Sequence, residues 1–257
     1  MKRKVYEQLL EWKSREHHKP LILYGVRQCG KTYILKEFGR QEFDSLAYVS
    51  CDRNVNLQAI YSGDFDVARI IQGLSALTGV DIIPGKTLIF LDEVQAFPQA
   101  LEALKYFCED APEYHIVVAG SLLGVALHAG VSFPVGKVQT LRLFPMDFEE
   151  FLMAMGEEQL LKLMHSHDYE LMNAFHEKLK DLLRQYYYVG GMPEVVKAFV
   201  ENKLLNQVRS LQNEILSNYA SDFSKHAPSQ EVPRIDMVWQ SILGQLSKEN
   251  KKFVYGV

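Results

Sequence analysis

An eight-residue loop at residues 25–32, with the sequence GVRQCGKT, constrains the fold of this chain more than any other segment. It follows a short apolar run at residues 20–24 and precedes residues 31–43, in which apolar residues recur at helical spacing. A strand, a glycine-bounded loop and a helix in that order form the context of the phosphate-binding loop G-x-x-x-x-G-K-[S/T]. The loop therefore predicts an α/β protein with a parallel sheet.

The first half of the chain repeats this alternation of apolar runs and amphipathic segments. We expect strands at residues 20–24, 46–51, 87–91, 116–119 and 138–143, and helices at residues 5–16, 31–43, 65–77 and 98–109. Short strands that are apolar on both faces and separated by helices are typical of a parallel sheet with helices on each face.

After residue 145 the pattern becomes helical. We expect helices at residues 148–155, 157–164, 169–187, 194–200, 204–223 and 232–246, and a strand at residues 252–257. Gly190 and Gly191 suit the end of one helix, and Pro193 suits the first turn of the next. We predict an α/β domain at residues 1–150, a helical region at residues 151–225 and a further segment at residues 226–257.

The loop itself is a candidate nucleotide site. Its glycines permit a tight turn, so that backbone N–H groups can face a polyphosphate at the start of a helix. We expect Lys31 to reach the β- and γ-phosphates and the Thr32 hydroxyl to bind Mg²⁺. The predicted phosphate-binding residues are Gly25, Val26, Arg27, Gln28, Cys29, Gly30, Lys31 and Thr32.

Two side chains of that loop allow more than one interpretation. Arg27 is equally suited to contact phosphate and to pair with an acid elsewhere in the chain. Cys29 stands where a small apolar residue is usual, which favours packing over redox sensing, although oxidation there would block nucleotide binding.

Paired acids end the strand expected at residues 87–91. Asp92 suits a Mg²⁺ ligand, and Glu93 suits a general base that polarises the attacking water. A glutamate beside the metal-binding aspartate favours hydrolysis over phosphoryl transfer to a small substrate. Asp92 and Thr32 are sixty residues apart, and together the two motifs predict an ATPase site with catalytic residues Glu93 and Lys31.

The strand at residues 116–119 should lie next to the one that ends at Asp92, because a single helix connects them. Ser121 follows this strand and is a candidate to touch the γ-phosphate or the attacking water. It is equally suited to cap a helix at residues 122–127, and one residue can do both.

Six ordered segments together resemble a prokaryotic AAA+ ATPase family: GVRQCGKT, LIFLDEVQ, AGSLL, residues 143–151 (LFPMDFEEF), residues 188–194 (YVGGMPE) and residues 245–253 (QLSKENKKF). The resemblance spans essentially the whole chain. It implies an N-terminal AAA+ domain, a helical region that leads into a winged helix, and usually a C-terminal restriction-endonuclease-like domain. That last domain is absent here, so we expect a chain truncated within the winged helix.

The chain departs from that family at Gly136-Lys137, where an arginine is usual. Such an arginine can act across a subunit interface, and lysine lacks its planar fork. Lys137 and Arg142 are the weak candidates for this role.

The charge and the cysteine content restrict the classes of partner and the cellular compartment. With 28 basic and 32 acidic residues, the net charge of −4 excludes a uniformly basic nucleic-acid coat but allows a local basic patch. The three cysteines are far apart and contain no CxxC pair, which indicates reduced thiols in the cytoplasm. The longest apolar run, residues 116–127, is shorter than the roughly 20 residues that span a membrane.

Three further clusters have simple structural interpretations. The sequence His165-Ser-His167-Asp168 resembles a metal site, but Asp168 is better suited to begin a helix. Of the three tyrosines at residues 186–188, we expect two to lie in the core. The lysines at residues 248–252 are equally compatible with a solvated turn and a DNA-facing edge.

We therefore predict Mg²⁺-dependent ATP hydrolysis coupled to the helical region, with DNA or a DNA-associated protein as a partner. The alternative is a nucleotide-gated signalling or defence switch whose output is homo-oligomerisation. A P-loop kinase ranks third, because of Glu93 and the helical region.

Overall fold

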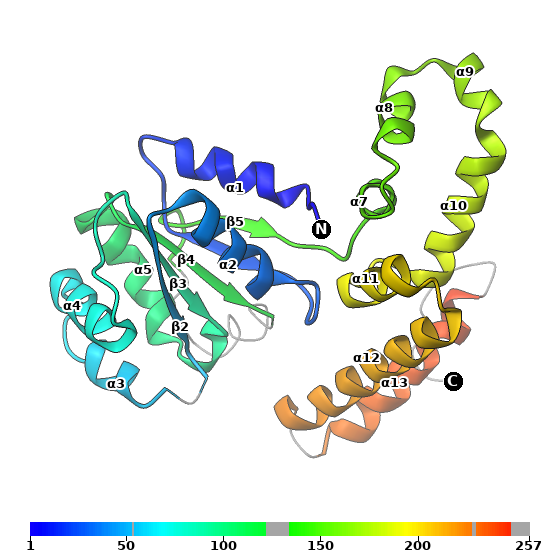
Figure 1. Cartoon of the computed structure of the whole chain (residues 1–257). Coiled ribbons are helices and arrows are strands. Elements are labelled where there is room, and N and C mark those ends of the chain that lie inside the picture. The colour runs from blue at the N-terminus through cyan, green and yellow to red at the C-terminus, as the bar shows by residue number, and fades with distance from the viewer. Residues whose placement is uncertain (53, 122–133, 228–229, 248–257) are drawn as a thin grey trace. The chain divides into compact units, whose positions relative to one another are not determined.

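The structure is a computed structural model that describes residues 1–52, 54–121, 134–227 and 230–247 (Figure 1). By its internal contacts the chain forms two compact units, Met1–Lys197 and Ala198–Val257.

A five-stranded parallel sheet is the centre of the first unit. Its strands are β1 (Leu21–Tyr24), β2 (Ser45–Ser50), β3 (Thr87–Asp92), β4 (His115–Gly120) and β5 (Gln139–Arg142), in the order β2-β3-β4-β1-β5. β4 lies between β1 and β3, with Leu21 opposite Val117 and Leu88 opposite His115. The expected adjacency of β3 and β4 is confirmed.

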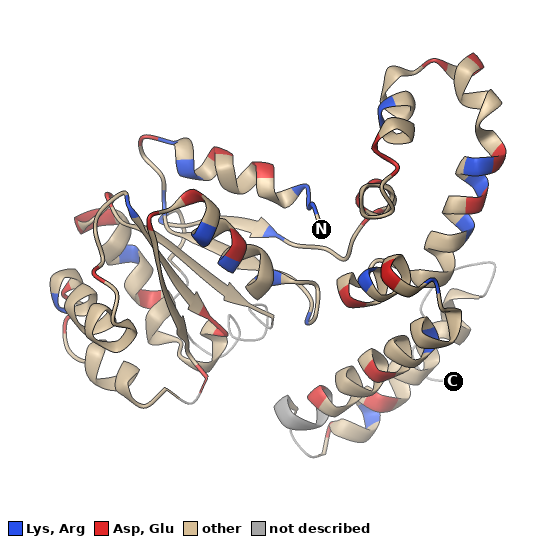
Figure 2. Cartoon of the chain, in the orientation of Figure 1, with Lys and Arg blue, Asp and Glu red and all other residues tan. Residues whose placement is uncertain are grey.

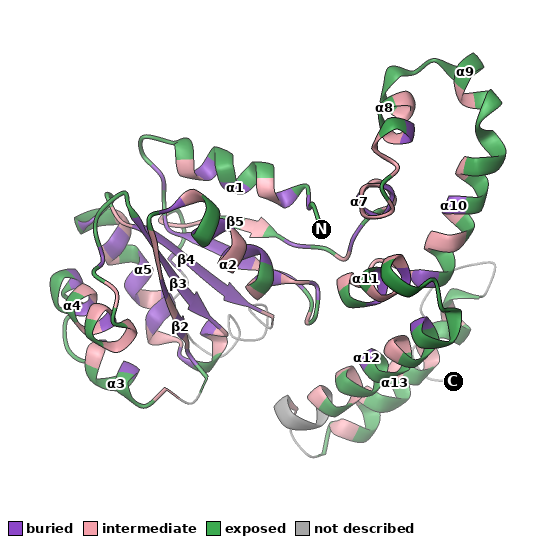
Figure 3. Ribbon diagram, viewed as in Figure 1, coloured by how far each residue is buried: buried purple, intermediate pink, exposed green. Residues whose placement is uncertain are grey.

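Helices cover both faces of this sheet (Figure 1). On one face lie α1 (Val5–Ser14) and α2 (Lys31–Glu42). On the other face lie α3 (Asn56–Ile60), α4 (Val67–Thr78) and α5 (Gln99–Asp110). A short 3-10 turn, η1 (Val94–Ala96), follows β3. Because alternate residues of a strand face opposite sides, Leu21 packs with α1 and α2 while Ile22 packs with α4 and α5. The three central strands, β3, β4 and β1, are buried along most of their length, whereas β2 is mostly half-buried and β5 is partly exposed (Figure 3). The predicted α/β fold is confirmed.

The rest of the first unit is helical, with α7 (Phe148–Ala154), α8 (Glu158–Ser166), α9 (Tyr169–Ala174) and α10 (His176–Val189). The next helix, α11 (Pro193–Asn202), contains the boundary between the two units. Leu152, Leu160 and Leu182 form a small core between α7, α8 and α10. Gly190 ends α10 with φ of 73° and Pro193 begins α11, as predicted.

Two expectations for this region are wrong. The single helix expected at residues 169–187 is two helices, which separate at Phe175. Of the three tyrosines, only Tyr186 is partly buried; Tyr187 and Tyr188 are 74% and 46% exposed. Successive residues of a helix point about 100° apart, so three in a row cannot share one core-facing side.

The second unit contains the helices α12 (Leu205–His226) and α13 (Val232–Leu246). Tyr219 of α12 stacks on Trp239 of α13, with ring centroids 6.0 Å apart and ring planes 14° apart. α13 has the predicted bounds. The strand expected at residues 252–257 and the lysines at residues 248–252 lie outside the described residues.

Candidate nucleotide-binding site

The loop at residues 25–32 connects β1 to α2, and its two glycines are needed for different reasons. Gly30 has φ of +94°, a left-handed conformation that favours glycine, and it directly precedes α2. Gly25 is needed because a Cβ there would lie 2.1 Å from the carbonyl oxygen of Leu143. The loop therefore turns at Gly30 and touches neighbouring backbone at Gly25.

The side chains between the glycines alternate in exposure. Val26 is 41% exposed and Gln28, with φ of 63°, is also exposed, whereas Cys29 is fully buried in the core beneath α1 and α2. Burial raises the pKa of the Cys29 thiol. The position is thus a packing position, as we expected from the sequence.

Lys31 is buried, and its ammonium group faces the loop. Lys31 Nζ donates hydrogen bonds to the carbonyl oxygens of Gly25, at 2.9 Å, and Val26, at 2.8 Å. Burial lowers the pKa of Lys31. The cation therefore lies within the turn of the loop.

Thr32 and Asp92 meet at the carboxyl ends of the strands. Thr32 Oγ1 donates to Asp92 Oδ2 at 2.7 Å, and Tyr48 OH donates to the same oxygen at 3.4 Å. Asp92 Oδ1 accepts the backbone N–H of Glu93 at 3.0 Å. Burial raises the pKa of Tyr48, and the charge of Asp92 adds to this effect. Sequence reasoning missed Tyr48, whose contribution depends on β2 lying beside β3.

Glu93 has an unusual backbone and a side-chain partner. Its φ of 51° is left-handed, and its Oε2 accepts a hydrogen bond from Gln95 Nε2. The other amide atom, Gln95 Oε1, is buried without a hydrogen-bond partner among the described residues. An amide can donate to a carboxylate only through its nitrogen, so Glu93 fixes the orientation of Gln95. Gln95 was also missed, although it stands two residues after the acidic pair.

Ser121 and Arg27 lie together at the end of β4. Arg27 Nε donates to Ser121 Oγ at 3.3 Å, which connects the loop to the strand that separates β1 from β3. The helix that Ser121 was expected to cap lies outside the described residues. The two weak candidates for a cation that acts across a subunit interface have partners within this chain. Lys137 Nζ pairs with Glu109 Oε1 at 2.8 Å, and the Arg142 guanidinium lies 4.5 Å from the ring centroid of Phe144.

The segment after β5 ties the helical region to the loop. Leu143 N donates to Tyr24 O at 2.8 Å, and Met146 N donates to Gly191 O at 2.6 Å. A Cβ at Gly191 would lie 2.1 Å from the Met146 carbonyl oxygen, and a Cβ at Gly30 would lie 3.8 Å from Pro193. Residues 143–146 and 191–193 thus meet beside the loop at residues 25–32.

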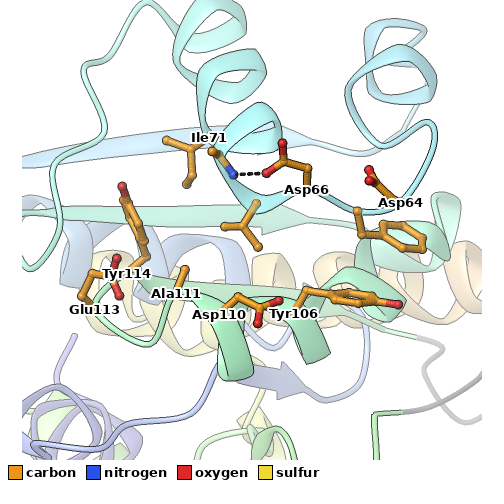
Figure 4. A pocket seen from close by; sticks show the side chains of 11 residues that line it. Asp64, Asp66, Ile71, Tyr106, Asp110, Ala111, Glu113 and Tyr114 are labelled. Carbon is orange, nitrogen blue, oxygen red and sulfur yellow. Dashed lines mark hydrogen bonds between the residues drawn. The ribbon is translucent and has the colours of Figure 1, made fainter.

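A separate cavity of about 650 Å³ is unsuited to nucleotide (Figure 4). Its walls include the rings of Phe65, Tyr106 and Tyr114, and its acids include Asp110 and Glu113. Carboxylates repel polyphosphate, and no residue of the loop lines this cavity. The loop and the ends of β3 and β4 remain the candidate site.

The described residues contain no cluster of three His, Cys, Asp or Glu side chains that could hold a metal ion. Asp168 begins α9 and its side chain accepts the Leu171 N–H at 2.9 Å, so the predicted helix cap is confirmed. Across the part of the chain that the structure describes, no helix is long and apolar enough to cross a membrane.

Comparison with known families identifies the fold. Residues 17–152, more than half of the chain, match a family described as an AAA domain, and the chain belongs to this family. Residues 180–256 match a second family, a domain of unknown function.

Among solved structures, the Walker-type ATPase PABY2304 of Pyrococcus abyssi is similar, with a TM-score of 0.59 and 16% sequence identity over 95% of this chain and 80% of that one. This likeness concerns the fold. A search of curated proteins gave no match.

Proposed function

We propose that this chain binds ATP with Mg²⁺ at residues 25–32 and hydrolyses it with Glu93 as the general base. The observation that supports this most strongly is the 2.7 Å contact between Thr32 Oγ1 and Asp92 Oδ2, beside Glu93. A hydroxyl and a carboxylate supply the oxygen ligands that Mg²⁺ prefers. The residues present therefore fit this ion, which would neutralise phosphate charge when bound.

Binding would use the loop's backbone and one cation. The N–H groups at the start of α2 point along a helix dipole whose positive end favours phosphate. Lys31, now bonded to the carbonyl oxygens of Gly25 and Val26, would exchange these partners for phosphate oxygens. The ammonium group is attracted more strongly by a phosphate anion than by a neutral carbonyl oxygen, so the exchange is favourable.

Hydrolysis would use Glu93 to accept a proton from the attacking water. Gln95 holds one oxygen of that carboxylate and leaves the other for water. Ser121, which accepts a hydrogen bond from Arg27, would contact the γ-phosphate end of a nucleotide bound by Lys31. Loss of the γ-phosphate on hydrolysis would therefore change the contact between Arg27 and Ser121 at the end of β4.

Coupling to the helical region would run through residues 143–146, which bond both to Tyr24 and to Gly191. The two candidate outputs of this coupling are work on DNA and nucleotide-gated oligomerisation. Basic and acidic side chains are mixed along α10 (Figure 2), and there Lys180 pairs with Glu177 and Arg184 with Asp181. Because these basic side chains are paired with acidic ones, α10 does not present a basic face of the kind that binds DNA.

Nucleotide titration tests the proposal. Wild-type protein should bind a fluorescent ATP analogue and release phosphate only when Mg²⁺ is present, and Lys31→Ala should lose binding. Arg40→Ala, which removes an exposed cation from the same helix, is the matched control and should bind normally. Equal ATP affinity in wild type and Lys31→Ala would refute the proposed site.

A further inference from the structure

Arg3 lies outside every motif, yet its side chain touches the nucleotide loop. The Arg3 side chain is only 7% exposed, and its Nη1 donates to the carbonyl oxygen of Cys29 at 3.0 Å. Its Nη2 donates to the carbonyl oxygen of Phe144 at 2.6 Å. One buried cation thus joins the loop to the segment that leaves β5.

The contact with Cys29 has a geometric consequence for phosphate binding. A phosphate loop needs its N–H groups to face the ligand, so its carbonyl groups must point elsewhere and find other donors. The carbonyl of Cys29 belongs to the same peptide group as the N–H of Gly30. Arg3 satisfies that buried oxygen, and in doing so it fixes the direction of the Gly30 N–H.

The third partner of Arg3 is Glu150, in the first turn of α7. Arg3 Nε lies 3.1 Å from Glu150 Oε1 as an ion pair, without the alignment of a hydrogen bond, and the Glu150 side chain is 6% exposed. The same oxygen accepts the backbone N–H of Lys4 at 2.7 Å.

The other oxygen of Glu150 belongs to the helix itself. Glu150 Oε2 accepts the Asp147 N–H at 3.3 Å, and Asp147 in turn accepts the Glu150 N–H, which completes a capping box. Glu150 is thus shared between the start of α7 and residues 3 and 4. A change at Arg3 must therefore alter the start of α7.

We propose that Arg3 is a positioning residue that orients the Cys29–Gly30 peptide for phosphate and connects the occupancy of the loop to α7 through Glu150. The inference rests on the proposed ATP binding and adds a coupling residue to that site. Arg3 does not touch nucleotide in this account; it acts through the loop's backbone. Lysine cannot replace it, because an ammonium group lacks the planar fork that reaches three acceptors at once.

The test compares Arg3→Lys and Glu150→Gln with a matched control, Lys2→Met, which removes a neighbouring cation whose side chain is 78% exposed. Two quantities are measured: the dissociation constant for a fluorescent ATP analogue, and amide hydrogen exchange in residues 148–154 with and without saturating ATP. Thermal unfolding shows that each variant is folded.

We expect Arg3→Lys to weaken ATP binding about 10- to 100-fold, the effect of losing charged hydrogen bonds, and Glu150→Gln to weaken it less. ATP should slow exchange in residues 148–154 of the wild type and of Lys2→Met, and this response should disappear in Arg3→Lys even at saturation. A merely structural role would leave the response intact.

Wild-type ATP affinity in both variants, or an unchanged exchange response in Arg3→Lys, would overturn this inference and leave the proposed ATP binding standing. If Arg3→Lys does not fold, the same two measurements on Glu150→Gln test the inference, because glutamine keeps the shape of the glutamate side chain. A wild-type protein that does not bind ATP refutes the proposed function, and this inference falls with it.

Discussion

Replacing Gly25 by alanine tests whether glycine is required here because a larger side chain would clash with neighbouring backbone. The motif requires glycine at this position, but Gly25 is not among the glycines with positive φ. Its constraint is the carbonyl oxygen of Leu143, which would lie 2.1 Å from an added Cβ. The Leu143 N–H donates to the Tyr24 carbonyl at 2.8 Å, so the clash falls on the last hydrogen bond between β1 and the chain after β5.

The expected cost follows from that geometry. An ordinary contact begins at 3.4 Å, so the two backbones would have to separate by about 1.3 Å. Overpacking of this kind costs about 1–3 kcal/mol. Loss of a buried backbone hydrogen bond adds about 1–3 kcal/mol. Gly25→Ala should therefore lower the free energy of unfolding by about 2–6 kcal/mol. At about 2–4 °C per kcal/mol, Tm should fall by about 4–24 °C.

Gly30→Ala is the matched control within the same loop. A Cβ at Gly30 would lie 3.8 Å from its nearest neighbour, so only the left-handed backbone opposes it, at about 1–2 kcal/mol. Thermal unfolding of the two variants by circular dichroism gives the comparison. A Tm loss in Gly25→Ala no larger than that in Gly30→Ala would refute the reasoning from contact.

Two further predictions concern groups whose pKa is shifted by burial. Burial lowers the pKa of His115 from 6.5 to about 4, and the His18 ring stacked on it at 3.8 Å adds to this effect. The unfolded chain therefore binds this proton more tightly, so stability is complete above pH 6.5 and falls by at most about 3 kcal/mol as the pH drops toward 4. Urea unfolding should show this loss in wild type and a smaller one in His115→Phe; equal losses would contradict the assignment. Burial also raises the pKa of the Cys29 thiol, and that of the Cys51 thiol to about 12, so at pH 8 iodoacetamide should label the partly exposed Cys108 well before either. Mass spectrometry of the labelled peptides measures the order, and early labelling of Cys29 would show that the loop opens.

The centre of the sheet could be predicted from sequence because β1, β3 and β4 are buried on both faces and are therefore largely apolar. Residues 87–91 and 116–119 contain no polar residue to interrupt the pattern after Thr87. The helix α3 was missed because it is short and has only one buried residue, Leu57. The break between α9 and α10 at Phe175 was missed because neither Gly nor Pro marks it.

The candidate nucleotide site was likewise predictable only in part. Lys31, Thr32 and Asp92 were predictable because their motifs follow parallel strands of one sheet, whose carboxyl ends lie at the same edge. Arg3 and Tyr48 were not, because each depends on contacts between segments far apart in the chain: Arg3 with residue 144, and Tyr48 with Asp92. No local pattern signals such a contact before the fold is known.

Hydrolysis by Glu93→Gln tests the central claim most directly. The amide keeps the size of the side chain but cannot accept a proton, so ATP affinity should stay within about threefold of wild type. Phosphate release should fall by about 10²–10⁴-fold, the usual contribution of a general base. Undiminished turnover in this variant, with ATP still bound, would contradict the assignment of Glu93 and the hydrolytic site built around it.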